Sequence, residues 1–263
     1  MSVNEWKKIL IPYEQAVEEL KIKLRNIRKE CKKKNIYSPI EFVTGRVKEV
    51  SSLLEKANKF DIPLNRIEYE IEDIAGIRIM CQFVDDVDRV VDIIRKRKDF
   101  QVIYEKDYVT NVKNSGYRSY HIVIKYPVNM VDGVKDILAE IQIRTLAMNF
   151  WATIEHSLNY KYKHNIPENI KIKLKSAADA AFRLDQEMLE IKEEIKDAQK
   201  LFNVKSSLVS DIMNNIARLE AMGKVQDSIR FRKTLDLLID EGDIIQISDL
   251  LEKTEKVLSM HRS

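Results

Sequence analysis

Three short polar motifs interrupt apolar segments of the chain, namely DIAGIR at residues 73–78, GYRSYH at 116–121 and EIQIRT at 140–145. Successive side chains of a strand point to opposite faces of the sheet, so each motif divides its residues into an apolar set and a polar set. An antiparallel sheet with one solvated face would show the same alternation. The arginine, histidine and carboxylate side chains of the polar set nevertheless favour a catalytic site on that face.

The alternation predicts which residues share the polar face. In the predicted strands at 77–83, 120–126 and 137–144, the polar face carries Arg78, Met80, Gln82, His121, Val123, Lys125, Glu140, Gln142 and Arg144. The opposite face carries mainly isoleucines, which suit packing against helices. Charged residues that recur on one face of several strands are typical of nucleotide and metal chemistry.

Helical and strand patterns alternate along the first part of the chain. Helices are expected at 5–34, 47–59 and 85–96, and strands at 77–83, 101–109, 120–126 and 137–144. Pro12 is expected near the first turn of the first helix, Pro127 at the end of the third strand, and a turn at Asp132 and Gly133. Thr145 is the expected N-cap of the next helix. This alternation predicts an α/β (α+β) domain with a mixed β-sheet flanked by helices.

The C-terminal part is predicted to consist of long helices. Pro167 is expected to begin a charged helix that ends near Phe202, and residues 206–263 have helical periodicity with breaks at Gly223 and Gly242. We therefore expect a first domain at residues 1–203 and an appended helical module at 204–263, to which the sequence assigns no chemistry.

Composition excludes several classes of protein. The 263 residues are 33% charged and 44% hydrophobic with a net charge of +3, as in a globular protein of one or two domains. Cys31 and Cys81 have no ligand spacing, which argues against a disulfide framework or structural zinc. No stretch approaches the roughly 18 apolar residues of a membrane span, so a cytoplasmic protein is expected. Residues 21–34 carry eight Lys/Arg against one Glu, which fits either a solvated helix face or a site for phosphates or nucleic acid.

Two carboxylates are candidate metal ligands. Asp73 precedes a predicted strand and Glu140 lies within one, so both could meet at one end of the sheet and hold Mg²⁺, which prefers oxygen ligands. Glu140 is also the candidate acceptor of a proton from an attacking hydroxyl. Each residue taken alone could equally be an ordinary surface acid.

A second set of residues indicates phosphate and base recognition. Lys48, Ser52 and Lys56 are four residues apart on a predicted helical face, where two like charges repel unless an anion neutralises them. Arg46 and Arg78 carry planar guanidinium groups that can stack on a base. Tyr117 follows a glycine in a predicted loop, where its ring could stack on a purine or pack as a lid over the core. The neighbouring Arg118 and His121 favour stacking.

These motifs resemble those of the small alarmone synthetases of the RelQ type, which are single-domain relatives of the Rel/SpoT synthetase domain. The resemblance covers roughly residues 5–202 and also includes FVTGRVK at 42–48 and AMNFWATIEH at 147–156. It implies a nucleotidyltransferase-like fold. It also implies Mg²⁺-dependent transfer of the β,γ-pyrophosphate of ATP to the 3′-hydroxyl of GDP or GTP, giving ppGpp or pppGpp and AMP. Some relatives also accept GMP.

The resemblance implies a role for individual residues. Arg46 and Arg78 would clamp adenine, and the ATP phosphates would be held by Lys48, Ser52 and Lys56. Asp73 and Glu140 would serve Mg²⁺, and Glu140 would activate the 3′-hydroxyl. Tyr117 would stack on guanine, and the rest of the guanine-nucleotide site would comprise Lys106, Arg118, His121, Gln142 and Glu155. The stretch 104–107 (YEKD) lacks the arginine of the Arg-x-Lys-Asp element of long Rel enzymes, which leaves the preferred acceptor open.

Regulation is also implied by the resemblance. The family forms homotetramers whose central cleft binds pppGpp as an activator, at positions that correspond to Lys21, Arg25, Phe42, Thr44 and Asn149. Some relatives bind single-stranded RNA. A chain without turnover, acting as a guanine-nucleotide sensor or as an RNA-binding regulator, is the alternative that the sequence leaves open. Alarmone hydrolysis is not expected, because the hydrolase of long Rel enzymes needs a His-Asp pair and no such dipeptide occurs.

Overall fold

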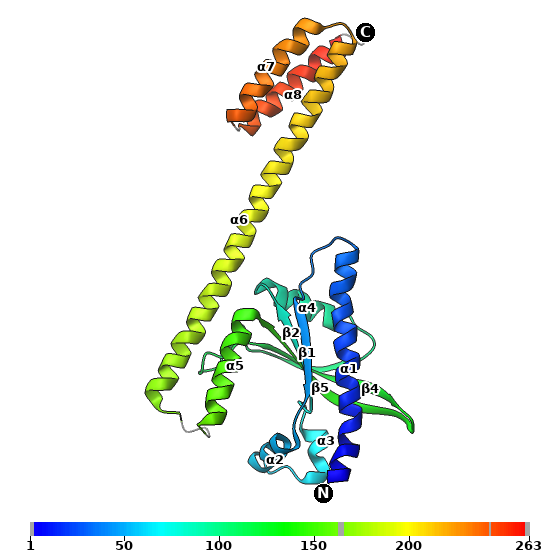
Figure 1. The fold of residues 1–263 in the computed structure, drawn as a ribbon, viewed down its shortest axis with the longest axis vertical. Helices are drawn as coiled ribbons and strands as arrows, with labels where there is room; N and C mark the ends of the chain where they lie inside the picture. The colour runs from blue at the N-terminus through cyan, green and yellow to red at the C-terminus, as the bar shows by residue number, and fades with distance from the viewer. Residues whose placement is uncertain (1–2, 163–165, 242, 261–263) are drawn as a thin grey trace. The chain divides into compact units, whose positions relative to one another are not determined.

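The computed structural model describes residues 3–162, 166–241 and 243–260. The chain divides into two compact units, residues 1–189 and 190–263. The helices of the first unit are α1 (Val3–Lys33), α2 (Val50–Lys59), α3 (Ile67–Glu70), α4 (Asp85–Arg95), α5 (Leu146–Lys161) and the first part of α6 (Glu168–Ala221), with a 3-10 turn at Leu64–Arg66. Its strands are β1 (Phe42–Val47), β2 (Ala75–Cys81), β3 (Gln101–Asp107), β4 (Tyr120–Met130) and β5 (Gly133–Thr145) (Figure 1).

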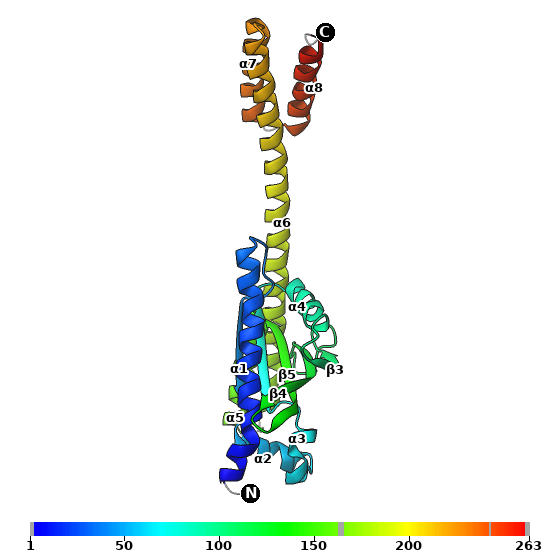
Figure 2. The same ribbon diagram turned by 90° about the vertical axis from the view of Figure 1, so that its right-hand side faces the viewer.

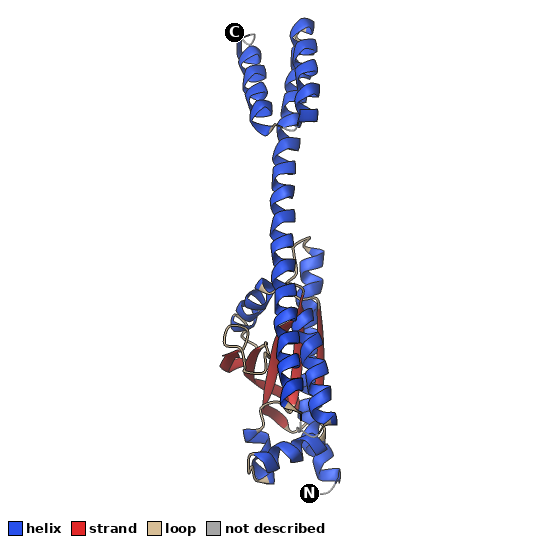
Figure 3. Ribbon diagram, turned by 90° about the vertical axis from the view of Figure 1, so that its left-hand side faces the viewer, coloured by secondary structure: helices blue, strands red, loops and turns tan. Residues whose placement is uncertain are grey.

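The five strands form one mixed sheet in the order β1-β2-β5-β4-β3. The central pair β2 and β5 is parallel, and the other neighbouring pairs are antiparallel. The predicted mixed sheet is therefore confirmed, and β1 adds an edge strand to the four strands expected from the sequence. All strands of the described residues lie in the first unit, as the strand colouring shows (Figure 3).

One face of the sheet packs into the main hydrophobic core. Helices α1 and α4 lie against the sheet (Figure 2). Both contribute to this core together with the isoleucines of β2, β4 and β5. Tyr13, Val17, Leu20 and Leu24 of α1 are buried there, which accounts for their three-to-four spacing in the sequence. The other face of the sheet is left for polar side chains, as the alternation predicts.

A close approach between α1 and β1 requires glycine at position 45. A Cβ atom at Gly45 would lie 2.8 Å from Cδ1 of Ile77 and 3.0 Å from Cγ1 of Val17. Both neighbours are buried core side chains, so they have little room to move. The glycine therefore lets the helix pack directly on the edge strand.

Several predicted boundaries are wrong, for identifiable reasons. Pro12 lies well inside α1 instead of near its first turn, since the flanking core contacts hold the helix together. The helix expected from residue 47 begins at Val50, because Val47 still pairs with Ala75 in the sheet. Strand β4 continues through Pro127, which pairs with Asp136.

The continuation of β4 has a simple cause. Strand β3 pairs with β4 only as far as Lys125, so one edge of β4 is open at Pro127, where a residue without an N–H group is tolerated.

The predicted end of the long C-terminal helix is also wrong. Helix α6 continues past Phe202 to Ala221, in keeping with the absence of Gly and Pro between residues 168 and 221.

The described part of the second unit consists of helices joined by short connections. The last turns of α6, α7 (Val225–Glu241) and α8 (Ile244–Met260) share a core that contains Ile212, Ile216, Leu219, Phe231, Leu235, Leu238, Ile247, Leu250 and Leu258. Gly223 follows α6 with a φ of +77°, a conformation that suits glycine after a helix. The second predicted break, Gly242, lies outside the described residues. The predicted domain limit at 203/204 stays a prediction.

No helix in the described part of the chain combines the length and apolar character needed to cross a membrane.

The junction between β5 and α5 depends on one threonine and one buried acid. The Oγ1 atom of Thr145 accepts a hydrogen bond from the N–H of Met148 at 3.1 Å, which confirms the predicted N-cap. The same hydroxyl donates to Oδ2 of Asp185 on α6 at 2.6 Å. Burial raises the pKa of Asp185 to about 6, although the Thr145 hydrogen bond opposes this shift.

We expect Asp185→Asn to stabilise the protein at neutral pH. A raised folded-state pKa means that the Asp185 contribution is fully present below the ordinary value of 3.8 and is lost as pH rises towards about 6. Ionisation of the buried carboxyl should lower the free energy of unfolding by roughly 1–3 kcal/mol. The neutral amide of the variant does not ionise, so its stability should not fall in this way. Urea unfolding at pH 4 and pH 7 would measure the effect, with the exposed Asp211→Asn as the matched control. Equal stability of Asp185→Asn and the parent protein at pH 7 would show that the buried carboxylate carries no such cost.

Candidate active site

The register of the strands places the predicted polar residues in rows across the sheet. Arg78 pairs with Gln142, and Gln142 pairs on its other side with His121. His121 in turn pairs with Lys106 of the outer strand β3. In the adjacent row, Gly76 pairs with Glu140. Because directly paired residues point to the same face, these side chains form one continuous polar surface.

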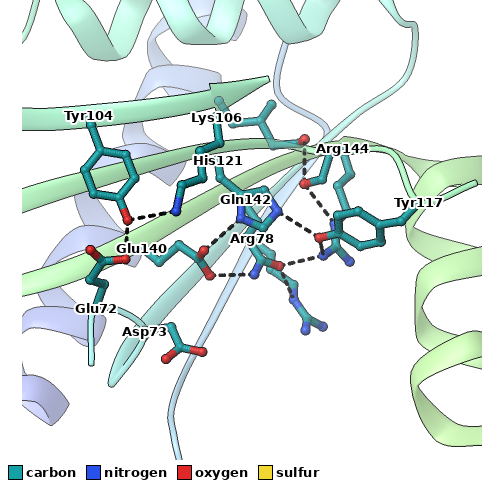
Figure 4. A network of polar contacts seen from close by, with 12 residues as sticks. Glu72, Asp73, Arg78, Tyr104, Lys106, Tyr117, His121, Glu140, Gln142 and Arg144 are labelled. Atoms are coloured by element: carbon teal, nitrogen blue, oxygen red, sulfur yellow. Dashed lines mark hydrogen bonds and ion pairs between the residues drawn. The ribbon is translucent and has the colours of Figure 1, made fainter. Parts of the chain in front are cut away.

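Glu140 lies at the centre of a hydrogen-bond network (Figure 4). Its Oε1 is 2.7 Å from Nδ1 of His121, and its Oε2 accepts a hydrogen bond from Nε2 of Gln142 at 2.7 Å. Burial of Glu140 favours its neutral form, but the bonds from His121 and Gln142 outweigh burial and hold the pKa of Glu140 below its usual range. Glu140 is therefore an ionised carboxylate that is ready to accept a proton.

Asp73 lies between two lysines. Its Oδ2 is 2.7 Å from Nζ of Lys48, and its Oδ1 is 2.8 Å from Nζ of Lys56. Burial opposes ionisation, but the two lysines lower the pKa of Asp73. Lys48 precedes α2 instead of lying on it, so the predicted helical stripe is wrong, although the fold still brings Lys48 and Lys56 together. Ser52 lies half-buried on α2 between them in sequence.

An open cavity of about 210 Å³ lies beside these residues. It is lined by Thr44, Gly45, Arg46, Lys48, Asp73, Gly76, Ile77, Arg78, Glu140 and Gln142. Burial lowers the pKa of Arg78, as do the charges of Arg144 and Arg46. The cations on the wall suit an anionic ligand.

The donor set of the cavity fits a magnesium ion that shares its coordination with a ligand. Asp73 and Glu140 both line the wall, and the negative charge of Asp73 acts to raise the pKa of Glu140. Among the described residues, no group of three or more His, Cys, Asp or Glu could hold a metal. Mg²⁺ commonly takes one or two carboxylates and completes its shell with water and phosphate oxygens. Asp73 would have to exchange its lysine contacts for the ion.

Tyr117 is held at the polar face by its hydroxyl group. The hydroxyl is 2.8 Å from Nε2 of His121, and it accepts a hydrogen bond from the guanidinium of Arg144 at 2.6 Å. The ring is half-buried, in an edge-to-face pair with Tyr108 and with Nζ of Lys113 4.9 Å from its centroid. Tyr117 also packs against the small cluster around Trp151 of α5. The packing interpretation of this residue thus has structural support, and its stacking on a purine stays a prediction.

The structure does not bring Arg118 to the cavity. Its guanidinium donates to the carbonyl of Ala178 and to Asp179, both on α6, at 3.4 Å each. It also lies 4.2 Å from the centroid of the Phe182 ring. Arg118 directly follows Tyr117 in sequence, but its contacts are with the helix beyond α5. Its predicted part in nucleotide binding has no support from this geometry.

The remaining predicted guanine-site residues lie around the network. Lys106 donates to the hydroxyl of Tyr104 at 3.2 Å, and that hydroxyl bonds to Glu72. Glu155 lies on α5, where it accepts a hydrogen bond from Asn159. Burial lowers the pKa of Lys113, and the charges of Glu140 and Glu155 act against this shift.

Sequence reasoning missed three residues of this region. Alternation placed Arg144 on the polar face, but no function was attached to it. Lys113 comes from the loop before β4, and no sequence signal pointed to it. His156 of α5 has a pKa lowered by burial and then by Arg46, which places it near the cationic wall. Its position within the predicted helix motif was the one available signal.

The five predicted activator residues do not form one cluster in the chain. Arg25 donates to the carbonyl of Val43 at 3.0 and 3.2 Å, and Lys21 pairs with Glu18 at 2.7 Å, both on the α1 side of β1. Thr44 instead lines the cavity. Phe42 is 41% exposed, and Oδ1 of Asn149 is buried without a hydrogen-bond partner among the described residues.

Comparisons with known proteins relate the chain to nucleotide enzymes. Residues 45–165 match the model of the region found in RelA / SpoT proteins. The chain is 58% identical over 205 residues to the GTP pyrophosphokinase YjbM of Bacillus subtilis, covering 78% of this chain and 97% of that protein. It is similar to the crystal structure of small alarmone synthetase 1 from Bacillus subtilis bound to its product pppGpp, with a TM-score of 0.71, 59% identity and coverage of 73% and 98%. The same enzyme bound to AMPCPP gives a TM-score of 0.65 at 55% identity, with coverage of 73% and 98%.

We expect Asp73→Asn to strengthen the binding of inorganic tripolyphosphate in the absence of metal. The amide leaves Lys48 and Lys56 without their counter-charge, so the wall should attract a polyanion about 3- to 10-fold more strongly. Isothermal titration in EDTA measures this, and Asp136→Asn, which removes the surface partner of Lys125, is the control. Unchanged or weaker binding would show that the two lysines do not face the anion.

Proposed function

Because the chain belongs to the RelA/SpoT family of GTP pyrophosphokinases, we propose that it synthesises the alarmones ppGpp and pppGpp. In this reaction the 3′-hydroxyl of GDP or GTP attacks the β-phosphorus of ATP, the β,γ-pyrophosphate is transferred, and AMP leaves. The chain is thus a transferase that uses ATP. The observation that carries the mechanism is an ionised, hydrogen-bonded Glu140 on the wall of a cationic cavity.

ATP is proposed to bind along this cationic wall. Arg46 and Arg78 present guanidinium groups that would enclose the adenine, whereas Lys48 and Lys56, with Ser52, would meet the phosphates. In the absence of nucleotide the two lysines neutralise Asp73, so they are already oriented toward one point. Phosphate oxygens would replace the carboxylate at the lysines as ATP enters.

Mg²⁺ is the proposed cofactor, held by Asp73 and Glu140. When bound, it would offset the negative charge that accumulates on the transferred phosphates. The protein's own contribution is the orientation of Glu140, which would draw the proton from the 3′-hydroxyl. Donation from His121 and Gln142 keeps that carboxylate ionised before the transfer.

The acceptor is proposed to bind on the β3–β4 side of Glu140. Tyr117 would stack on guanine, and Lys106, His121, Gln142 and Glu155 would surround the nucleotide. GMP is a further candidate acceptor, which would give pGpp. Homotetramer formation, activation by pppGpp and binding of single-stranded RNA are proposals that rest on the family resemblance alone. A non-catalytic sensor has no support from the comparisons.

Product analysis tests the proposed reaction. The purified protein is incubated with Mg²⁺, ATP and, in separate samples, GMP, GDP or GTP, and the nucleotides are separated by ion-exchange chromatography. AMP should form together with a 3′-pyrophosphorylated guanosine nucleotide, and the rates would rank the three acceptors. No product with any acceptor, even with added pppGpp, would refute the proposal.

We expect Glu140→Gln to lower kcat by about 10²- to 10⁴-fold, since the amide cannot accept the proton. The matched control is Glu105→Gln on β3, where the acid pairs with Arg95 and Tyr120 outside the cavity lining. Binding of the non-hydrolysable analogue AMPCPP, measured by calorimetry, should change little in either variant. A Glu140→Gln protein that keeps full turnover would remove Glu140 from the mechanism.

We expect Lys21→Ala to abolish activation by added pppGpp and to leave the basal rate unchanged, because Lys21 is not among the described residues that line the cavity. Lys21 is preferable to Arg25, whose guanidinium holds the Val43 carbonyl. The exposed Lys29→Ala on the same helix is the control. A parallel fall of the basal rate in Lys21→Ala would argue against a separate activator site.

A further inference from the structure

We propose that Arg144 is a positioning residue that fixes the direction of the two hydrogen-bond paths leading to Glu140. The inference deepens the proposed function, because it concerns the orientation of the proposed proton acceptor. Arg144 belongs to β5, two residues beyond Gln142 on the same face of the sheet. No motif-based prediction gave this residue a role.

Arg144 is a buried cation that contacts neutral groups. It is only 4% exposed, and its guanidinium donates to the Tyr117 hydroxyl at 2.6 Å, to Oε1 of Gln142 at 2.8 Å and to Oγ of Ser119 at 3.1 Å. Within the described part of the chain, no ion pair links Arg144 to a carboxylate. Burial of a charged arginine without a carboxylate partner destabilises the fold, and an apolar side chain would fill the position at a lower free-energy cost. The position therefore calls for a role beyond packing.

The first path runs from Arg144 through Tyr117 and His121 to Glu140 (Figure 4). The groups at its two ends fix the direction of donation along the path, since a guanidinium can only donate hydrogen bonds and an ionised carboxylate can only accept them. The Tyr117 oxygen accepts from Arg144 and has one proton to give, which goes to Nε2 of His121. A neutral His121 then carries its proton on Nδ1 and donates it to Oε1 of Glu140.

The second path runs through Gln142 and has the same direction. Arg144 and Nε of Arg78 both donate to Oε1 of Gln142, at 2.8 and 3.3 Å. The amide nitrogen of Gln142 must therefore face Glu140, and it donates to Oε2 at 2.7 Å. Both oxygens of Glu140 thus receive hydrogen bonds from side chains that Arg144 orients. The two bonds hold the carboxylate group in one rotational position.

Removal of Arg144 would release these orientations. The Tyr117 oxygen could then accept from Nε2–H of His121, and His121 would present an unprotonated Nδ1 to Glu140. Two acceptors would face each other at 2.7 Å, so Glu140 would have to turn away. A displacement of about 1 Å in a reacting group can cost about 10²-fold in rate. Synthesis should therefore fall although every group proposed to bind substrate is still present.

The test compares Arg144→Met, which removes all donors but keeps a long side chain, with Arg144→Lys, which keeps a charge and a donor. The readout is the tautomer of His121, observed by long-range ¹⁵N–¹H correlation spectra of full-length protein labelled at histidine. The chain has four histidines, so the His121 signal can be assigned by its loss in His121→Gln. Spectra are recorded in alkaline buffer, where a free histidine is neutral.

The parent protein should show His121 with its proton on Nδ1. Arg144→Met should lose this preference and lower kcat about 10²-fold, with the KM for ATP within about 3-fold of the parent. Arg144→Lys should keep part of the preference of His121 for the Nδ1 proton and part of the parent kcat. If Arg144→Met fails to fold, Tyr117→Phe breaks the first path at its hydroxyl and should shift the His121 tautomer in the same way.

Two results would overturn the inference, namely an Nε2–H tautomer in the parent protein, or an unchanged tautomer and kcat in Arg144→Met. A failure of the proposed function can be told apart from a failure of this inference. If the parent protein makes no alarmone while Arg144→Met still shifts the tautomer, the hydrogen-bond paths stand and the catalytic assignment falls.

Discussion

The site depends on the parallel pairing of β2 with β5. This pairing sets Arg78 beside Gln142 and Gly76 beside Glu140. The antiparallel partner β4 then places His121 beside Gln142, in the same row as Arg78. A shift of one residue in either strand would turn the whole polar set toward the core. The isoleucines on the opposite face, buried under α1 and α4, oppose such a shift. The core therefore determines the register, and the register assembles the polar network.

The polar face is organised by internal charge pairs before any ligand arrives. Asp73 neutralises Lys48 and Lys56, while His121 and Gln142 satisfy Glu140. These pairs orient the side chains that the proposed reaction needs, so little reorganisation of the lysines would be required if, as proposed, a triphosphate replaced Asp73 there. All of these residues belong to the first unit, whereas the second unit, residues 190–263, is built around an apolar core of its own.

Much of the sheet and its polar face could be predicted from the sequence, because period-two alternation directly reports which side of a strand is buried. Edge strand β1 was harder, since its core contacts come from Val43 and the close approach at Gly45, which no local pattern reveals. The position of Arg118 against α6 depends on tertiary packing between distant segments. Arg144 was placed on the correct face, but its importance follows from hydrogen-bond partners that only the folded chain brings together.

The most direct test of pyrophosphate transfer is phosphorus NMR of the reaction with ATP and GDP, because it identifies the bond that is broken. We predict that AMP and a 3′-diphosphate on the guanosine product appear together at equal rates, without ADP. Formation of ADP together with a 3′-monophosphate on guanosine would mean that the γ-phosphoryl group alone is transferred to the acceptor, and formation of ADP with orthophosphate would mean that it is transferred to water. Either result would contradict a site built for pyrophosphate transfer.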